Sequence, residues 1–351
     1  MVFILIMILI LIFNSAKIAE ENEFMNDYMS REKTSAIKGL FVILIILSHY
    51  SQYVVLDGQY DSPYLLLQNH LHQMVVVMFW FYSGYGIMES ISAKGYTYVK
   101  TIMSKRFVTV LVNFDFAVLL YACVALIIGR NFSVMDFFLS LIGWSSIGNS
   151  NWYIFVTLVL YFIVFISFVI LKWSDKKTSR YIGALLVTIL SIVFIYIMIK
   201  MKRPTRYYNT TIIFSLGMWY SIVRKYAEKF LLKKDSYYGL FCAGLVCTYS
   251  LSYFNRWKYG IEGYTVWAVL FTIMIVVFTM KISVYNNLLK WFGNHVFSIY
   301  ILQRIPMILL AQTSLNEHHK YIFLILSVLI TIFIAIAFDS FTGKIWKRVY
   351  K

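Results

Sequence analysis

The sequence predicts an all-α membrane protein, a bundle of about ten transmembrane helices preceded by a further hydrophobic segment. Three observations predict this fold class. Of the 351 residues, 60% are hydrophobic and only 14% are charged, whereas soluble domains carry about 25% charged residues. Apolar runs near spanning length recur along the whole chain and leave no room for a separate soluble domain. The basic residues gather in alternate loops.

We expect each apolar run to form one helix, because about 20 residues are needed to cross the hydrocarbon core. The sixth and seventh runs are short for a span. The ten expected spans are 36–56, 71–91, 106–129, 151–171, 181–199, 207–223, 238–254, 264–281, 294–312 and 321–340.

The loop charges set the expected orientation. With the residues before the first span in the cytoplasm, 22 of the 32 Lys and Arg residues fall in cytoplasmic segments and eight fall outside. This bias predicts that both ends of the 31–351 body are cytoplasmic. It also accounts for the net charge of +16 without a nucleic-acid partner. The exception is Lys200–Arg206, which is either an outer basic patch or a sign that one span is miscounted.

The chain divides into three expected parts. Residues 1–30 hold an apolar segment, Val2–Phe13, and a polar linker; 31–343 form the membrane domain; 344–351 form a short basic cytoplasmic tail. The first segment lacks a basic start and is a poor signal peptide. Two interpretations remain open for it, a thin extra helix or a wrongly assigned start codon.

The first span carries the main candidate residues, Lys38 and His49. They are 11 residues apart, so on a helix they share one face about 16 Å apart along the axis. An ionisable side chain at membrane depth is a functional-site hypothesis, and histidine can accept or give a proton near neutral pH. The alternatives are a histidine hydrogen-bonded inside the bundle and a lysine that snorkels to the interface.

Other candidates come from the second and third spans. Lys105 and Arg106, in a basic cytoplasmic loop, suit a phosphate-bearing ligand or are ordinary positive-inside residues. Asp115, inside the third span, either orients the histidine or forms a structural pair. Ser83 and Tyr85 flank glycines that admit a ligand or another helix backbone.

The outer ends of later spans add polar and aromatic candidates. Asn151 and Trp152 open the fourth span, where aromatic residues also serve as interfacial anchors. Tyr300, Gln303 and Arg304 follow one another along the ninth span, which we expect to be a single helix. No spacing of His, Cys, Asp or Glu predicts a metal site.

Taken together, the pieces resemble the family-3 membrane acyltransferases. The order and spacing of these pieces carry the resemblance over about residues 31–340. The matching residues are Lys38 and His49, Ser83-Gly84-Tyr85, Lys105-Arg106, Asn151-Trp152-Tyr153, and Gly293 through Tyr300.

The resemblance implies acyl transfer, in the first instance of an acetyl group, from cytoplasmic acyl-CoA to a hydroxyl of a carbohydrate in a cell membrane. No cofactor is expected to be bound, and acyl-CoA is the donor substrate. The implied partners are acyl-CoA, the carbohydrate acceptor and the lipid bilayer. The implied roles are catalysis for His49 and Asp115, donor binding for Lys38, Lys105 and Arg106, and substrate binding for Ser83, Tyr85, Asn151, Trp152, Tyr300, Gln303 and Arg304.

This chain departs from the family pattern at three points. Lys38 stands where many members have Arg, the basic pair before the third span is adjacent, and Gln303 stands where a histidine often follows the late motif. Three alternatives remain open. Gln303 leaves an inactive homologue possible, buried His, Asp and Arg suit a transporter or flippase for a lipid-linked saccharide, and the basic Lys200–Arg206 cluster suits a polysaccharide polymerase or ligase. The acyl group, the sugar and the oligomeric state are not specified by the sequence.

Overall fold

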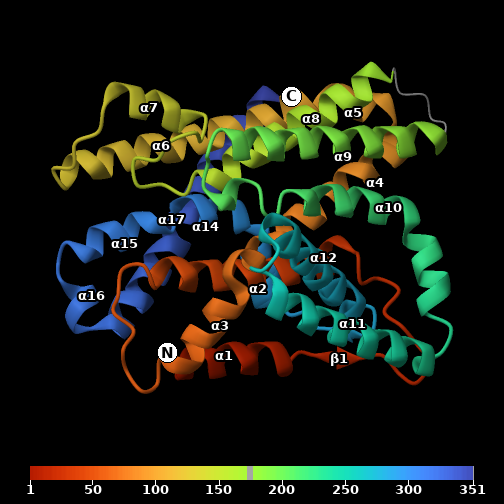
Figure 1. Cartoon of the computed structure of the whole chain (residues 1–351). Coiled ribbons are helices and arrows are strands. Elements are labelled where there is room, and N and C mark those ends of the chain that lie inside the picture. The colour runs from red at the N-terminus through yellow and green to blue at the C-terminus, as the bar shows by residue number, and fades with distance from the viewer. Residues whose placement is uncertain (172–176, 351) are drawn as a thin grey trace.

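The computed structural model describes residues 1–171 and 177–350 and consists almost entirely of helices (Figure 1). Within these residues the one sheet is a two-stranded antiparallel ladder, in which β1 (Lys17–Ile18) pairs with β2 (Ile282–Ser283). An all-α fold suits the membrane, because a helix satisfies its own backbone hydrogen bonds where water is absent. The predicted fold class is therefore confirmed.

The long helices follow the expected spans, and shorter ones fill the loops between them. The helices are α1 (Val2–Phe13), α2 (Arg31–Tyr50), α3 (Ser62–Leu71), α4 (Val77–Lys94), α5 (Tyr96–Ile102), α6 (Thr109–Ile127), α7 (Val134–Leu141), α8 (Trp152–Ile170), α9 (Lys177–Lys200), α10 (Ile212–Leu231), α11 (Asp235–Asn255), α12 (Gly260–Thr279), α13 (Asn287–Asn294), α14 (Val296–Leu302), α15 (Arg304–Ala311), α16 (Leu315–His318) and α17 (Lys320–Val349), with η1 (His72–Val76), η2 (Met103–Val108) and η3 (Thr205–Tyr207) as tighter or wider turns.

Every expected span coincides with a helix or a group of helices. Among the described residues, seven segments are long and apolar enough to cross a membrane, and the bent pair of α13 with α14–α15 makes an eighth. The expected sixth and seventh spans correspond to α10 and α11, which have 20 and 21 residues but are more polar than these eight. The multi-pass architecture is thus confirmed, with α10 and α11 as its most polar members.

The expectation that Gly293 through Arg304 lie along one helix was wrong. The chain bends by 63° between α13 and the helix that follows, and a second break at Gln303 separates α14 from α15. Pro306 explains the second break, because it has no amide hydrogen to donate to the carbonyl of Leu302. The two breaks separate Gly293, Tyr300 and Arg304 onto different helices.

Two pairs of helices pack through glycines at close range. A Cβ atom on Gly84 of α4 would lie 2.0 Å from the Phe214 carbonyl oxygen of α10, and one on Gly217 would lie 2.0 Å from that of Phe81. Gly39 of α2 and Gly293 of α13 meet the facing backbone in the same way. In a bilayer, helices associate through such close van der Waals packing rather than through exclusion of water.

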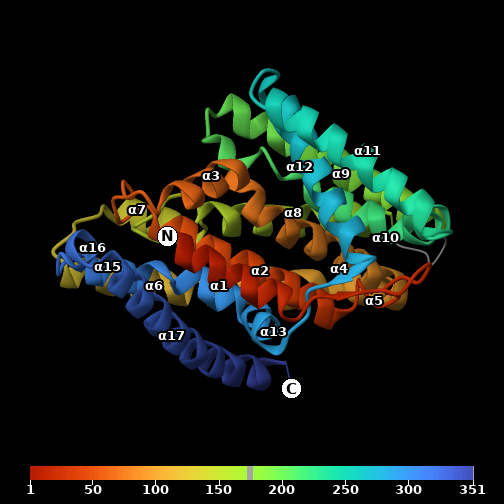
Figure 2. The ribbon, with the colours of Figure 1, turned by 90° about the horizontal axis from the view of Figure 1, so that it is seen from below.

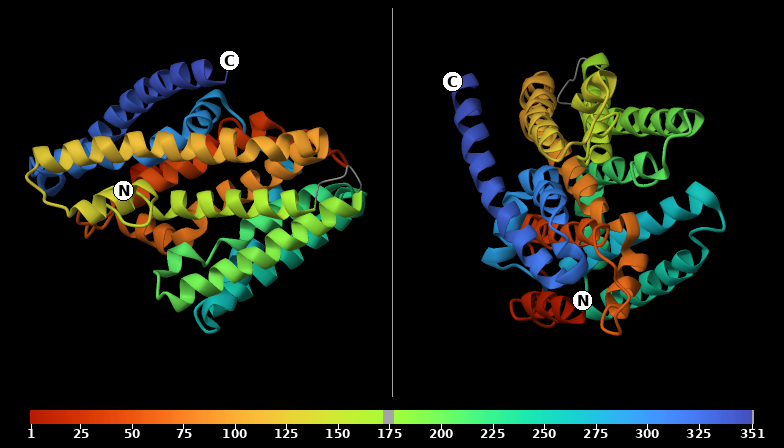
Figure 3. Two further views of the ribbon diagram at one scale, coloured as in Figure 1. Left: turned by 90° about the horizontal axis from the view of Figure 1, so that it is seen from above. Right: turned by 90° about the vertical axis from the view of Figure 1, so that its left-hand side faces the viewer.

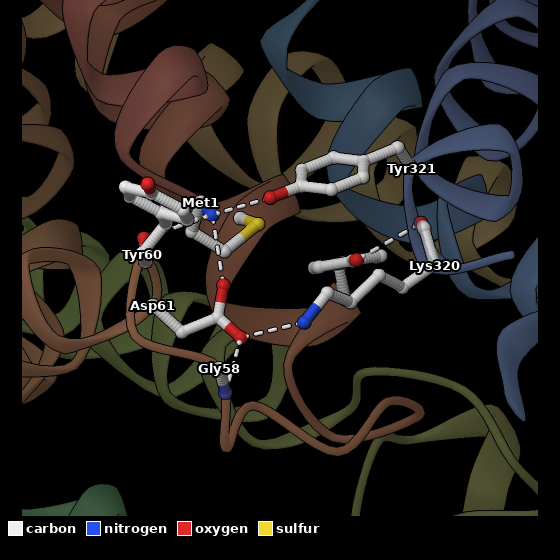
Figure 4. A network of polar contacts seen from close by, with 7 residues as sticks. Met1, Gly58, Tyr60, Asp61, Lys320 and Tyr321 are labelled. Carbon is white, nitrogen blue, oxygen red and sulfur yellow. Dashed lines mark hydrogen bonds and ion pairs between the residues drawn. The ribbon is translucent and has the colours of Figure 1, made fainter.

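The first helix is attached to the bundle at both of its ends. The Met1 amino group donates to Asp61 Oδ1 at 2.8 Å, and Lys320 of α17 donates to Asp61 Oδ2 at 2.6 Å (Figure 4). At the other end Asn286 donates to the Leu11 carbonyl at 3.2 Å. In Figure 2, α1 overlaps α2, and the two helices line one apolar cavity. The segment expected as a thin extra helix is thus a helix of 12 residues.

The last helix, α17, is the longest and extends away from the bundle at its C-terminal end (Figure 3). Basic residues expected in a tail over 344–351 belong to its last turns, since the helix continues to Val349. It contacts α6 through side chains, including a 2.8 Å hydrogen bond from Trp346 to Asn113. Lys172 and Lys176, which we assigned to a cytoplasmic loop, lie outside the described residues, as does Lys351.

Candidate active site

Two adjoining cavities run along the inner face of α2. The first, which we call the inner cavity, has a volume of about 330 Å³; the second, the outer cavity, has about 460 Å³. Both are lined by Ile45, Val76 and Tyr300. The names follow the side that the loop charges predict for each. Because α2 is an unbroken helix, it carries Lys38 into the inner cavity and His49 into the outer one.

The inner cavity combines two cations with aromatic and hydroxyl groups. Lys38 and Arg106 line it, and so do Ser83 of α4 and Tyr161 of α8, whose hydroxyl groups lie 3.4 Å apart. Neither cation has a carboxylate within 4.0 Å in residues 1–171 and 177–350. Cations without acidic partners beside a cavity can bind an anionic ligand such as phosphate.

A π-helical turn, η2, places the basic pair. It joins α5 to α6 and contains Lys105 and Arg106. Such turns are rare and often occur at functional sites, since they turn side chains away from their ordinary helical positions. Both side chains are exposed, but Arg106 lines the inner cavity, whereas Lys105 does not and lies over the Tyr350 ring, 5.6 Å from its centroid. The structure therefore separates the two members of the pair.

His49 lines the outer cavity, beside Tyr300, which lines both cavities. Their ring centroids are 6.3 Å apart. The His49 Nδ1 atom, the Tyr300 hydroxyl and the Gln303 Oε1 atom are all buried without a hydrogen-bond partner. The Gln303 side chain lies within hydrogen-bonding reach of His49. Buried polar atoms are nearly always paired, so the Tyr300 hydroxyl marks a place where a ligand or water completes the contacts.

The break between α3 and η1 lines the outer cavity. His72 has a φ of +43°, a conformation that is strained for a residue with a side chain and that gathers at functional sites. Its ring nitrogen lies 3.1 Å from the Tyr264 hydroxyl. Around it the helix end supplies amide side chains to the cavity. These amides are Gln68, Asn69 and Gln73.

Three of the remaining predicted residues lie at or near the outer cavity. Trp152 lines the outer cavity, and Arg304 lies behind it, donating to Gln52 at 3.1 Å and to the Tyr53 hydroxyl at 3.3 Å. Gln303 is fully buried, and its Nε2 donates to the Tyr300 carbonyl at 3.2 Å.

Lys105, Gln303 and Arg304 line neither cavity, and three further predicted residues share this. Tyr85 accepts a hydrogen bond of 2.9 Å from Arg224 of α10. Asn151 donates to the Gly143 carbonyl and to the Tyr207 hydroxyl, at 2.8 and 3.1 Å, and so fixes the start of α8. Asp115 is half-buried on α6, and its Oδ1 has no partner. No hydrogen bond joins Asp115 to His49 in the described part of the chain.

Sequence reasoning missed two features near the site. Arg206 of η3 lines the outer cavity, although the sequence placed it only in a basic loop. Asp339 of α17 binds the Ser298 hydroxyl and His295 Nδ1, the latter at 2.5 Å, and so joins α14 to α17. The hydrophobic run around Asp339 gave one signal, an acidic residue inside an apolar helix.

The profile of acyltransferase family 3, described as an acyltransferase domain, matches residues 35–339. The chain belongs to acyltransferase family 3. The matched region runs from the first turns of α2 to Asp339 and contains both cavities of this family-3 acyltransferase. A search of curated proteins and a search of solved structures gave no match. Within the described residues no group of three His, Cys, Asp or Glu could hold a metal ion.

Proposed function

We propose that this family-3 acyltransferase moves an acyl group, in the first instance acetyl, from acyl-CoA in the cytoplasm to a hydroxyl of a carbohydrate on the outer side of the cell membrane. The observation that carries the proposal is that Tyr300 lines both cavities and that His49 lies beside it in the outer one. A donor that enters from one side and an acceptor that enters from the other would meet at these residues.

The inner cavity suits part of the donor. Ligand pockets hold about 300–1,000 Å³, and 330 Å³ lies at the low end, which fits an acyl group on a pantetheine arm rather than a whole nucleotide. Lys38 and Arg106 would bind phosphate oxygens at the mouth, with Arg106 able to make two parallel hydrogen bonds. Lys105 would contribute charge outside the cavity.

The chemistry needs one base. His49, as a neutral imidazole, takes the proton of the acceptor hydroxyl while its oxygen attacks the thioester carbon. The carbon–sulfur bond then breaks, the proton passes to the departing thiolate, and an ester and free CoA result. The unpartnered Tyr300 hydroxyl is available to donate to the oxygen that becomes negative in the tetrahedral intermediate. The alternative in which His49 first accepts the acyl group uses the same residues.

Membranes that contain the protein, incubated with radiolabelled acetyl-CoA and saccharide acceptors, test the proposal. We expect labelled acceptor with the wild type and at least a hundredfold less with His49→Gln, because general-base catalysis contributes about 10²–10⁴-fold. His319→Gln, an exposed histidine outside both cavities, is the matched control. Full activity of His49→Gln would refute the role of His49, and growth of the glycan chain without acyl transfer would indicate a polymerase.

A further inference from the structure

The outer cavity has a charge bias that acyl transfer alone does not require. Its lining contains one arginine, two histidines and several amides, and no Asp or Glu. Cavities for neutral sugars do not require a cation, since hydroxyl groups are satisfied by amides and by mixed donors and acceptors. A guanidinium group in this cavity therefore points to an acceptor that carries negative charge.

Arg206 is free to bind such a charge. No carboxylate lies within 4.0 Å of it in residues 1–171 and 177–350. Its neighbour Arg203 differs, because it lies between the rings of Trp144 and Tyr207 and donates to the Trp144 carbonyl at 2.7 Å. Arg203 thus anchors the segment, and Arg206, three residues on, faces the cavity.

A second cation, Arg304, adds positive charge next to the outer cavity. Arg304 makes hydrogen bonds only to neutral partners, Gln52 and Tyr53, among the described residues. Gln52 in turn lines the cavity. The positive charge of Arg304 is therefore not neutralised by an adjacent carboxylate, and an anion in the cavity would be attracted by two guanidinium groups.

The other groups of the outer cavity suit a sugar ring. Trp152 offers an aromatic surface against which the apolar face of a sugar can pack. Gln68, Asn69 and Gln73 supply both donors and acceptors for ring hydroxyls. The cavity lies beside His49, so a sugar held there presents its hydroxyl groups to the proposed base.

We propose that the acceptor is an acidic saccharide, whose carboxylate or phosphate binds Arg206 while a hydroxyl of the same sugar or its neighbour reaches His49. This inference rests on the proposed function, which it narrows to one class of acceptor. A uronic-acid glycan and a sugar-phosphate glycan share the chemistry that Arg206 recognises, namely an anion that accepts two parallel hydrogen bonds.

Matched acceptors test the charge directly. Oligosaccharides that contain glucuronic acid are compared with the same oligosaccharides after reduction of the carboxyl group to an alcohol, and phosphodiester-bearing saccharides with their dephosphorylated forms. We expect Arg206→Gln to raise the KM for the acidic acceptor by about tenfold or more and to leave the KM for the neutral one unchanged. Lys200→Gln, which removes an exposed charge at the end of α9 and outside the cavity, should change neither.

The outcomes separate this inference from the proposed function. Equal KM values for acidic and neutral acceptors, unaffected by Arg206→Gln, would overturn the inference while acyl transfer stands. If no saccharide is acylated, calorimetry of the same saccharides with the purified protein still tests whether the outer cavity prefers an acidic ligand. Binding of the acidic form that Arg206→Gln abolishes supports the inference, and absence of charge preference refutes it. An effect of Arg206→Gln that vanishes in vesicles of neutral lipid would assign Arg206 to lipid headgroups instead.

Discussion

At the residue scale, Lys38 and His49 lie in two different cavities, although one helix, α2, carries both. Lys38 is half-buried at the inner cavity and has no acidic partner in the described residues, and His49 lies about 16 Å further along α2. In the proposed reaction, this separation lets Lys38 bind the donor phosphate near the membrane surface while His49 acts on the acyl group at depth. A half-buried cation without an acidic partner does not stabilise the fold, so we expect it to bind a ligand.

Replacing Lys38 with Gln should weaken donor binding without removing the base. We expect the KM for acyl-CoA to rise roughly tenfold, because one charge-assisted hydrogen bond contributes about 1.5–3 kcal/mol, while kcat falls much less. Steady-state kinetics in membranes measures both constants. Arg31→Gln removes the same charge from an exposed position on α2 and should leave the KM unchanged. A KM that does not respond to Lys38→Gln would mean that this lysine is a membrane anchor.

The sequence could predict that Lys38 and His49 lie along one helix, because a single unbroken helix converts spacing into position. It could not place Arg206, which reaches the outer cavity from a separate turn, η3. Nor could the sequence show that only Arg106 of the Lys105-Arg106 pair lines the inner cavity, because the π-helical turn that orients the two side chains is set by tertiary packing. The same limit applies to Tyr85, whose partner Arg224 is 139 residues away.

At the element scale, close helix contacts fix the walls of the site. The glycine contacts between α4 and α10, and between α2 and α13, leave no room for a Cβ atom. They set the distance at which α4 presents Ser83 to the inner cavity and at which α2 presents Lys38. The second glycine of the α4 motif differs, because a Cβ atom on Gly86 meets nothing within 4 Å and this residue lines the inner cavity.

This contrast predicts opposite effects for one substitution at two positions of α4. Gly84→Ala should destabilise the protein by about 1–3 kcal/mol, since the added methyl group overpacks a backbone contact. Gly86→Ala should be neutral or slightly stabilising, because alanine favours a helix by about 1 kcal/mol over glycine. The unfolding temperatures of the two variants are compared in detergent, where the loss of monodisperse protein on heating reports unfolding. Equal unfolding temperatures would contradict the packing role of Gly84.

The existence of the long helices was predictable from apolar runs, and their breaks were less so. Pro306 marked the break at Gln303, although we expected the helix to continue. The break at His72 and the 63° bend before α14 carry no proline or glycine signal at the break itself. They arise where the chain turns to fit neighbouring helices, as the contact of His72 with Tyr264 illustrates.

At the scale of the whole molecule, a polar network joins segments that are far apart in sequence. Asp61, only 1% exposed, receives hydrogen bonds from the Met1 amino group, the Gly58 amide and Lys320 (Figure 4). Burial alone would raise the pKa of Asp61, but these hydrogen bonds lower it below its usual value. The carboxylate therefore holds α1, the loop before α3 and the start of α17 together in its charged form.

Asp61→Asn should lower the stability of the whole bundle. Removing one partner from a buried ion pair is expected to destabilise by about 3–5 kcal/mol. Because the folded pKa lies below the unfolded one, the stabilisation is present above about pH 4 and is lost as the pH falls through the folded pKa. Unfolding temperatures measured over this range should depend on pH more in the wild type than in Asp61→Asn. Asp57→Asn, in the same loop but exposed, should resemble the wild type.

The class of the molecule was the most predictable level, because composition and loop charges report on the membrane directly. The two cavities were not predictable, since they arise from α2, α4, α8 and the broken α14 together. Because the two cavities adjoin, the central claim is that donor and acceptor enter from opposite sides of the membrane and meet at His49.

Vesicles with the purified protein in one orientation test that claim most directly. Acyl-CoA is supplied at the face that carries Lys38 and Arg106, and the saccharide acceptor only at the opposite face. The account predicts that the acceptor becomes acylated across the bilayer with the wild type and not with His49→Gln. Acylation only when donor and acceptor share one face, or an undiminished rate with His49→Gln, would contradict it.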